Sequence, residues 1–353
     1  MELRPPFRAV RLGALAALLL TAAAGFAAKS AAAGAVNIYS YRQPELIQPL
    51  LDAFTAETGL VTNVLFLEKG LEERIEAEGR NSPADVILTT DIGRLDSAKS
   101  KGITQPVTEA AINSNIPENY RDTEGHWFGL TIRGRVVYAS KQRVGQNAIT
   151  YEELADPKWK GKICVRDGQH VYNVALIASM IANKGAEFAE TWLTGVRDNL
   201  ARKPAGGDRD QAKGVFAGEC DIALGNTYYV ALMQTNEKEA EQKDWAAAIK
   251  VIFPNTADRG THVNISGMAL AKHSPHKDAA LKLMTFLASP KAQQIYAEEV
   301  FEYPVAPGTK PSAIVEAFGA IKPDPLAIGE IAKFRQQASE LVDKTGFNNG
   351  PQS

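Results

Sequence analysis

Two adjacent tyrosines, Tyr228 and Tyr229, carry the side chains best suited to chemistry in this chain. They follow a strand-like run over residues 220–225. A phenol is neutral near pH 7 because free tyrosine titrates at about 10, but a strongly charged cation can displace its proton. The resulting phenolate is the kind of oxygen ligand that hard cations prefer. The alternative is a structural pair in which one ring fills the core and the other covers the surface.

Three arginines are placed where they could bind an oxyanion. Arg42 precedes a predicted helix that starts at Pro44, and backbone N–H groups at a helix start favour anions. Arg133 lies in a long β-rich run, and Arg209 ends the glycine-rich segment 206–209. The alternative for each arginine is an ordinary surface ion pair, which is the commoner arrangement.

Motifs of the common hydrolases and metalloenzymes are missing. The chain has no G-x-S-x-G, H-E-x-x-H, P-loop or C-x-x-C. Residues 274–277 formally match S-x-x-K, but Ser274 fits better as a helix N-cap with Pro275 at the first helical position. The histidines lack the paired spacing of a zinc site, and only His170 lies near another candidate ligand, Tyr172. The sequence therefore favours a binding protein over an enzyme.

The N-terminus has the pattern of a cleaved export signal. Its basic residues are Arg4, Arg8 and Arg11. An apolar run over 12–26 and an alanine-rich zone follow, so that Ala27 or Ala33 would end a leader lying within residues 1–33. A membrane span needs about 20 apolar residues, which makes the run short for a retained anchor, the alternative. We therefore expect an exported, soluble protein.

Length and charge narrow the class of partner. About 320 residues remain after the leader, enough for two domains of about 100–200 residues each. The formal net charge of −2 is close to neutral, and charges of both signs are interspersed. We therefore expect no nucleic-acid partner and no membrane-surface binding.

The chain has two cysteines, Cys164 and Cys220. In an oxidising compartment a disulfide is favoured over two free thiols, although the sequence leaves both states open. The cysteines lie eight residues before Tyr172 and Tyr228, respectively. A bond would therefore join two strands that each lead toward a tyrosine, and chain entropy predicts a stabilisation of roughly 4 kcal/mol.

Short β-rich runs alternate with helical patterns, which predicts parallel α/β sheets with both faces covered. The strand-like runs are residues 35–39, 61–66, 85–89, 128–139, 162–165 and 221–224, and helical spacing is clearest at 44–54, 71–78 and 172–183. In such sheets ligands bind beyond the carboxyl ends of the strands. Tyr228 and Tyr229 follow one strand end, Tyr172 begins the helix after another, and Tyr41 stands just past the first strand.

Several segments, taken in order along the chain, match one family. They are residues 37–46, 82–86, 162–166, 171–173, 202–204, 206–209, 225–229 and 264–267. Together with the export signal they resemble the periplasmic ferric-ion-binding proteins of bacterial ABC iron importers over nearly the whole mature chain. The most specific part is the Asn-Thr-Tyr-Tyr sequence at 226–229 with a tyrosine-bearing helix upstream.

The resemblance implies an α/β fold with two lobes, the type II periplasmic-binding-protein architecture, with a hinge and an interlobe cleft. The lobes would be residues 34–131 plus 256–306 (N-terminal) and 138–255 plus 307–353 (C-terminal), joined by crossovers at 132–137 and about 253–264. Closure of such lobes around a ligand is a hinge motion.

The resemblance also implies the ligands. Carried over by motif, Tyr172, Tyr228 and Tyr229 would bind ferric iron, Fe(III). Many members add a His-Tyr pair after the first strand, but this chain has Gln43 and Pro44 there. The three-tyrosine subgroup instead completes the shell with water or with a bidentate anion, commonly carbonate or bicarbonate.

Arginines would hold that anion, and Arg42 and Arg133 match those positions. Residues expected around the ligands are Tyr41, Gln43, Asn173, Asn226 and Arg209. Protonation of carbonate or tyrosine at low pH would weaken binding. The implied protein is a monomeric periplasmic receptor that delivers iron to an inner-membrane ABC permease and its ATPase. The alternative is a protein of the same fold that binds a small organic or oxyanion ligand.

Overall fold

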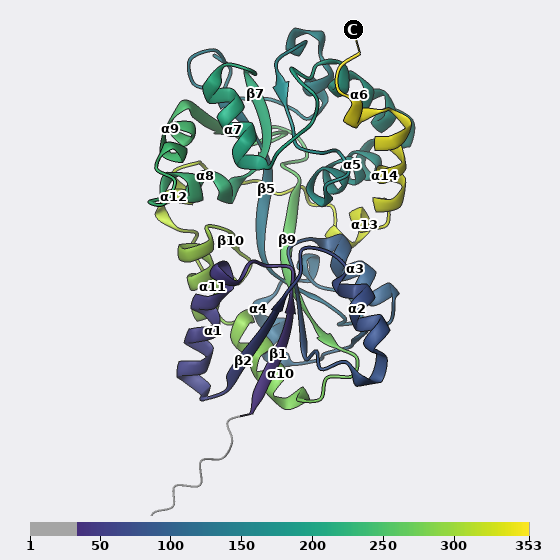
Figure 1. Ribbon diagram of the computed structural model, residues 1–353, viewed down its shortest axis with the longest axis vertical. Helices are drawn as coiled ribbons and strands as arrows, with labels where there is room; N and C mark the ends of the chain where they lie inside the picture. Colours follow the sequence, from purple (N-terminus) through teal and green to yellow (C-terminus); the bar gives the residue numbers. More distant parts are fainter. Residues whose placement is uncertain (1–33, 353) are drawn as a thin grey trace, which may run out of the picture. The chain divides into compact units, whose positions relative to one another are not determined.

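A computed structural model describes residues 34–352 (Figure 1). The predicted export signal lies outside the described residues. Within residues 34–352, no helix combines the length and hydrophobicity that a membrane crossing requires.

The strands join into one mixed sheet. They are β1 (Ala35–Ser40), β2 (Val61–Phe66), β3 (Val86–Thr89), β4 (Thr104–Gln105), β5 (Phe128–Ser140), β6 (Ile163–Cys164), β7 (Ile222–Asn226), β8 (Ile249–Ile252), β9 (Val263–Ala271) and β10 (Tyr303–Pro304). The main path runs β2-β1-β3-β9-β5-β7-β6; β4 pairs with β9, and β8 and β10 pair with β5.

Helices connect most of these strands. They are α1 (Pro44–Thr58), α2 (Leu71–Glu78), α3 (Ile92–Ser100), α4 (Ala110–Asn115), α5 (Val171–Lys184), α6 (Ala186–Asp198), α7 (Asp208–Ala217), α8 (Thr227–Gln234), α9 (Glu241–Ala248), α10 (Lys277–Ala288), α11 (Pro290–Ile295), α12 (Ala313–Glu316), α13 (Ile328–Ala332) and α14 (Arg335–Lys344). A π-helical turn covers Tyr296–Val300, and short 3-10 turns cover 79–81, 118–120, 152–155, 157–159 and 347–349.

The expectation of parallel sheets is only partly correct. β1 pairs in parallel with β2 and β3, and β6 with β7. α1 connects β1 to β2, and α5, α6 and α7 connect β6 to β7, as the helical crossovers that parallel neighbours need. β9 and β5, however, are antiparallel to each other and to β3 and β7, respectively. The strand–helix alternation did not predict these antiparallel strands, because they pair with partners distant in the sequence.

The long strand β5 changes partners halfway along its length. Residues 128–134 pair with β9, whereas residues 135–139 pair with β7 and residues 137–140 with β8. Figure 1 shows β5 and β9 side by side, leading from the part of the sheet with β1 and β2 toward the part with β7. One continuous strand therefore links the two parts of the sheet.

Apolar side chains fill both parts. α1 follows the predicted pattern: Pro44 occupies its first turn, Ile47, Leu50, Leu51 and Phe54 are buried, and Gly59 ends it in a left-handed conformation (φ 71°).

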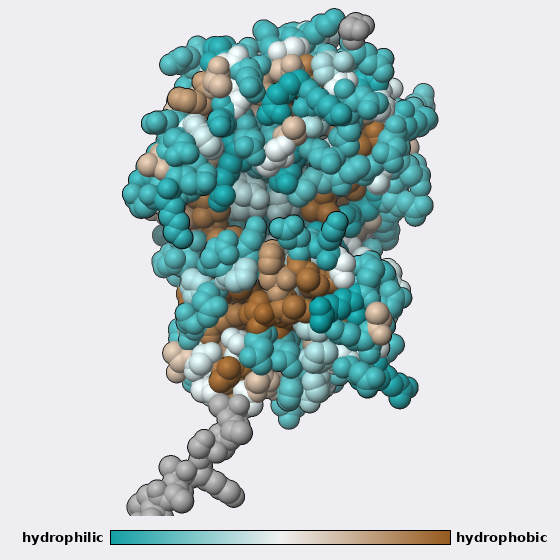
Figure 2. Space-filling view, viewed as in Figure 1, coloured by the Kyte–Doolittle hydropathy of each residue, from teal (hydrophilic) through white to brown (hydrophobic). Residues whose placement is uncertain are grey.

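In Figure 2 the visible face is largely hydrophilic, and an apolar area gathers over β1 and β2 of Figure 1. Val64, Leu65 and Phe66 of β2 are only half-buried.

Candidate functional site

Three tyrosines meet at the N-terminal turns of α5 and α8. The phenolic oxygens of Tyr172 and Tyr228 lie 3.3 Å apart, and the ring centres of Tyr228 and Tyr229 lie 4.2 Å apart. α8 follows β7 directly, and α5 follows β6 after a short loop. Because β6 and β7 are parallel neighbours, their carboxyl ends meet at one edge of the sheet. The structure thus brings together the three tyrosines that the sequence singled out.

Burial strongly favours the neutral form of Tyr228 and Tyr229. It raises the pKa of Tyr228 well above its ordinary value, and the neighbouring phenols of Tyr172 and Tyr229 raise it further, while Arg133 and Arg42 lower it. The pKa of Tyr229 is also raised, by burial and then by Tyr172 and Asp208. A cation that binds the phenolates must therefore displace protons, so binding should depend on pH.

His170 caps the helix that carries Tyr172. Its Nδ1 accepts a hydrogen bond from the backbone N–H of Tyr172 at 3.3 Å. Burial, followed by the charge of Arg166, lowers the pKa of His170 to about 3. The imidazole is therefore neutral at pH 7 and can accept this bond, which assigns His170 a capping role at the helix start.

Arg133 is the arginine best placed to take an anion. It is 1% exposed, and its guanidinium carbon lies 5.3 Å from the ring centre of Tyr172. Nη1 donates to the hydroxyl of Ser266 at 2.9 Å. Within residues 34–352, Nε and Nη2 have no hydrogen-bond partner. Buried donors normally have partners, so these two nitrogens are suited to a ligand.

Arg42 lies on the same side of the site but is already paired. Its Nη2 lies 2.7 Å from the carboxylate of Glu302 and also contacts Ser266. Its charge nevertheless acts on Tyr228, whose pKa it lowers. Arg42 therefore contributes positive potential to the site, with one nitrogen committed to Glu302.

The other predicted residues lie around this cluster, and Tyr41 lines a cleft that also borders Tyr172 and Tyr229. The Tyr41 hydroxyl donates to Glu72 and accepts from the Leu71 N–H at 2.9 Å, and Arg94 covers its ring at 3.6 Å. These contacts commit the Tyr41 hydroxyl to the start of α2. Arg209 stacks on the Tyr229 ring at 5.4 Å.

Gln43 is exposed on the wall of a cleft. This cleft, of about 800 Å³, is also lined by Arg166, His170, Tyr172 and Tyr229. A second hollow of about 580 Å³ shares Gln43, Arg166 and Tyr229 with it and adds Tyr228 and Arg209. The tyrosines are therefore accessible to a ligand that enters from solvent.

Four charged residues that the sequence did not single out complete the site. They are Arg135, Arg166, Asp208 and Glu302. Asp208 is adjacent to Arg209, and Arg135 is two residues from Arg133. Both therefore lie within segments that the sequence had marked, 206–209 and 128–139. Burial raises the pKa of Asp208, but Arg135 and Arg166 more than offset this and hold it below its ordinary value.

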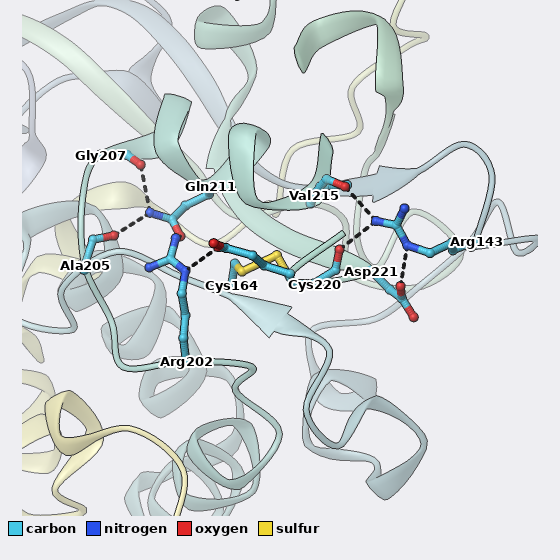
Figure 3. The surroundings of a disulfide bond; sticks show 10 residues. Arg143, Cys164, Arg202, Ala205, Gly207, Gln211, Val215, Cys220 and Asp221 are labelled. Atoms are coloured by element: carbon cyan, nitrogen blue, oxygen red, sulfur yellow. Dashed lines mark hydrogen bonds and ion pairs between the residues drawn. A yellow bond between two sulfur atoms is a disulfide. The ribbon is translucent and has the colours of Figure 1, made fainter. Parts of the chain in front are cut away.

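Cys164 and Cys220 form a disulfide with 5.8 Å between their Cα atoms, as Figure 3 shows. The bond joins the end of β6 to the residues before β7. Gln211 of α7 donates beside it to the carbonyls of Ala205 and Gly207, at 2.7 and 2.8 Å. The strands that lead to Tyr172 and Tyr228 are thus covalently joined.

The donor set is unusual for a metal site. Within residues 34–352, no group of three or more His, Cys, Asp or Glu side chains is arranged to hold a metal ion. The clustered oxygens are phenolic, and arginines surround them. Such a set suits a hard, highly charged cation together with an anion.

Comparisons with known proteins bear on this site. The family described as bacterial extracellular solute-binding protein matches residues 81–318. Iron uptake protein A1 of Synechocystis sp. is 40% identical over 314 residues, which cover 88% of this chain and 87% of that protein. The major ferric iron-binding protein of Neisseria meningitidis serogroup B is 27% identical over 330 residues, covering 92% and 97%, respectively.

Solved structures give the same picture. The Bordetella ferric binding protein is similar with a TM-score of 0.83 and 51% identity, covering 89% of this chain and 100% of that chain. A Trichodesmium protein in complex with iron and citrate is similar with a TM-score of 0.84 and 43% identity, covering 89% and 100%.

Proposed function

This chain belongs to the bacterial extracellular solute-binding proteins, and we propose that it is the ferric-iron receptor of a bacterial iron uptake system. Members of this family are transport components that bind solutes and are not enzymes. The likenesses also confirm the fold class predicted from the sequence, the two-lobed α/β fold of periplasmic binding proteins. The similar proteins that are named for iron support the choice of solute.

The observation that carries the proposal is the contact of the three phenols beside a buried arginine with two unpartnered nitrogens. Three phenolates, from Tyr172, Tyr228 and Tyr229, would neutralise the charge of Fe³⁺. Bound cations of high charge stabilise the deprotonated ligand, which offsets the raised pKa of Tyr228 and Tyr229. Hard oxygen donors also select against softer metals.

An anion would complete the coordination. The free Nε and Nη2 of Arg133 support a planar oxyanion such as carbonate, because a guanidinium can donate to two oxygens at once. Citrate, present with iron in the Trichodesmium relative, is another oxyanion, whose carboxylates a guanidinium could bind in the same way. Arg42 and Arg209 would add positive charge near the same position.

Lobe closure would enclose the iron. We propose lobes of residues 34–131 plus 256–306 and 138–255 plus 307–353, with crossovers at 132–137 and about 253–264. The change of partner along β5 supports the first crossover, because Gly134 pairs with β9 and Arg135 with β7. The closed receptor would then act as a monomer in the periplasm and deliver iron to an inner-membrane permease and its ATPase.

Metal analysis and a visible spectrum of the purified protein test the proposal. We expect one ferric ion per chain and a phenolate-to-iron charge-transfer colour that strengthens when bicarbonate is added. A calorimetric panel of anions, sugars and polyamines without iron serves as the comparison. A colourless protein that does not bind Fe³⁺ and instead binds one of these organic ligands or oxyanions would refute the iron assignment.

A further inference from the structure

Asp208 is buried and lines the hollow that Tyr228 and Tyr229 also border. It is the first residue of α7 and is 1% exposed. Its Oδ2 accepts from Arg135 Nη1 at 2.6 Å and from the Asn226 backbone N–H at 2.9 Å. Its Oδ1 accepts from Arg166 Nη1 at 3.2 Å. One carboxylate thus joins α7, β5, the end of β7 and the loop before α5.

Arg135 extends these contacts to the segments that carry the tyrosines. Its Nη2 donates to Asn173 Oδ1 at 2.8 Å, and its Nη1 also donates to Asn226 Oδ1 at 3.1 Å. Asn173 directly follows Tyr172, and Asn226 lies two residues before Tyr228. Asn173 in turn donates to the carbonyls of residues 166 and 167, at 3.0 Å each. Asp208 and Arg135 therefore tie together both segments that carry the phenols.

We propose that Asp208 is the positioning residue that fixes the spacing between Tyr172 and the Tyr228–Tyr229 pair and thereby the geometry of the iron site. The identity of the bound ion rests on the proposed function, whereas the spacing itself does not. Charge-assisted hydrogen bonds are short and directional, so they hold three segments in one arrangement. Metal ligands must lie within about 0.5 Å of the productive geometry, and supporting contacts set that precision.

Removing the charge of Asp208 should disturb this arrangement in a definite way. The guanidinium groups of Arg135 and Arg166 share Asp208 as their buried counter-charge. Without it the two cations repel each other, and buried charges without a partner are strongly unfavourable. We expect Arg166 to move toward the cleft and Asn173 to lose its fixed partner, so Tyr172 shifts away from Tyr228.

Asp208→Asn tests the proposal, with Asp210→Asn as the matched control. Asp210 lies two residues further along α7 and borders the same hollow, but it is exposed, and within residues 34–352 its side chain accepts only from the Gly207 N–H. Both substitutions remove one carboxylate from the first turn of α7. They therefore share the loss of a negative charge from the helix start, and they differ in the contacts to Arg135 and Arg166.

Metal-free crystal structures give the first readout, the distance between the phenolic oxygens of Tyr172 and Tyr228, which is 3.3 Å in the parent. We expect D208N to separate them beyond hydrogen-bonding distance and D210N to leave them in place. The second readout is the ferric charge-transfer band. In D208N it should shift and weaken, with affinity for Fe³⁺ lower by about tenfold or more. A purely stabilising residue would lower the melting temperature and leave this band unchanged.

Parental spacing together with a parental band in D208N would overturn the proposal. If D208N does not fold, Asn173→Ala decides by the same two readouts, because it cuts the link from Arg135 to the Tyr172 segment and keeps Asp208 charged. A shifted Tyr172 and an altered band support the proposal, and parental values refute it. If the parent itself takes up no ferric iron, the proposed function fails, and the metal-free spacing alone decides the role of Asp208.

Discussion

The carboxylate of Glu302 and the guanidinium of Arg42 form a buried ion pair with 2.7 Å between Oε1 and Nη2. Glu302 also accepts from Thr131 and from the Ser266 hydroxyl. Ser266 in turn accepts from Arg133 at 2.9 Å. One carboxylate therefore orients both arginines of the candidate anion site, Arg42 directly and Arg133 through Ser266.

Glu302→Gln should destabilise the protein by about 3–5 kcal/mol, because it leaves a buried arginine without its partner. Urea unfolding of the metal-free protein measures this change, and exposed Glu299→Gln is the control. Burial raises the pKa of Glu302, but Arg42, Arg133 and Thr131 outweigh it and hold the pKa below the ordinary 4.5. The stabilisation is thus present above pH 4.5 and is lost as pH falls through the folded-state pKa. If the difference in unfolding free energy between parent and variant does not shrink on acidification, this prediction is wrong.

Tyr229→Phe should abolish most of the charge-transfer colour and weaken ferric binding, because it removes one of three phenolates. The band and a competition titration against a chelator measure the two effects. Tyr120→Phe is the control, since Tyr120 is a half-buried tyrosine that lines neither hollow of the site. Full colour in the Tyr229 variant would exclude it as a ligand.

Arg133→Gln should remove the dependence of ferric affinity on bicarbonate. The Nε and Nη2 of Arg133, which lack a hydrogen-bond partner among residues 34–352, are the groups that would hold the anion. Glutamine cannot replace their paired donation. Titrations with Fe³⁺ at several bicarbonate concentrations measure the slope of ferric affinity against bicarbonate concentration. Exposed Arg80→Gln should keep the parental slope. The assignment of Arg133 to anion binding fails if the Arg133 variant also keeps the parental slope.

The double variant Cys164→Ser, Cys220→Ser should lose roughly 4 kcal/mol of unfolding free energy in the chain-entropy model, given the sequence separation of 56 residues. Urea unfolding of metal-free protein gives the value, and the parent with reductant is the comparison. Equal stability of parent and variant under oxidising conditions would show that the cross-link does not stabilise the fold.

His262 should make the protein less stable as pH falls from 7 toward 4. Burial and the nearby Arg135 lower the pKa of His262 to about 3. The unfolded chain, with an ordinary pKa of 6.5, therefore binds the proton first, and stability declines between pH 6.5 and 3. As the pH is lowered across this range, the urea concentration at the midpoint of unfolding should fall less steeply for His262→Gln than for the parent. Exposed His273→Gln should follow the parent; an identical slope for all three proteins would contradict the assignment.

Local sequence patterns predicted much of the secondary structure. The helix predicted at 71–78 coincides with α2, and the β-rich run 128–139 is β5 with one residue added. The phenol cluster was also predictable, because parallel strand ends meet at one edge of a sheet whatever lies between them in the sequence.

Contacts between distant segments were not predictable from such patterns. The pairing of Asp208 with Arg135 spans 73 residues, and that of Glu302 with Arg42 spans 260. Neither spacing has a local signature, because an ion pair of this kind depends on tertiary packing alone. The same limit applies to the contacts of Tyr41, which lines the cleft as its position past a strand end indicated but whose hydroxyl contacts Glu72.

All three candidate phenols come from one stretch of chain, residues 172–229, which also contains Asp208 and which the disulfide joins to β6. All the phenolate ligands would therefore be in place before any second part of the protein, such as Arg42 beside the anion, arrives. Opening the cleft would expose the ion without removing a phenolate from it. Handing over the cargo would then require an exchange of ligands, such as protonation or competition by the acceptor, and the lifetime of the loaded receptor would be set by that chemistry.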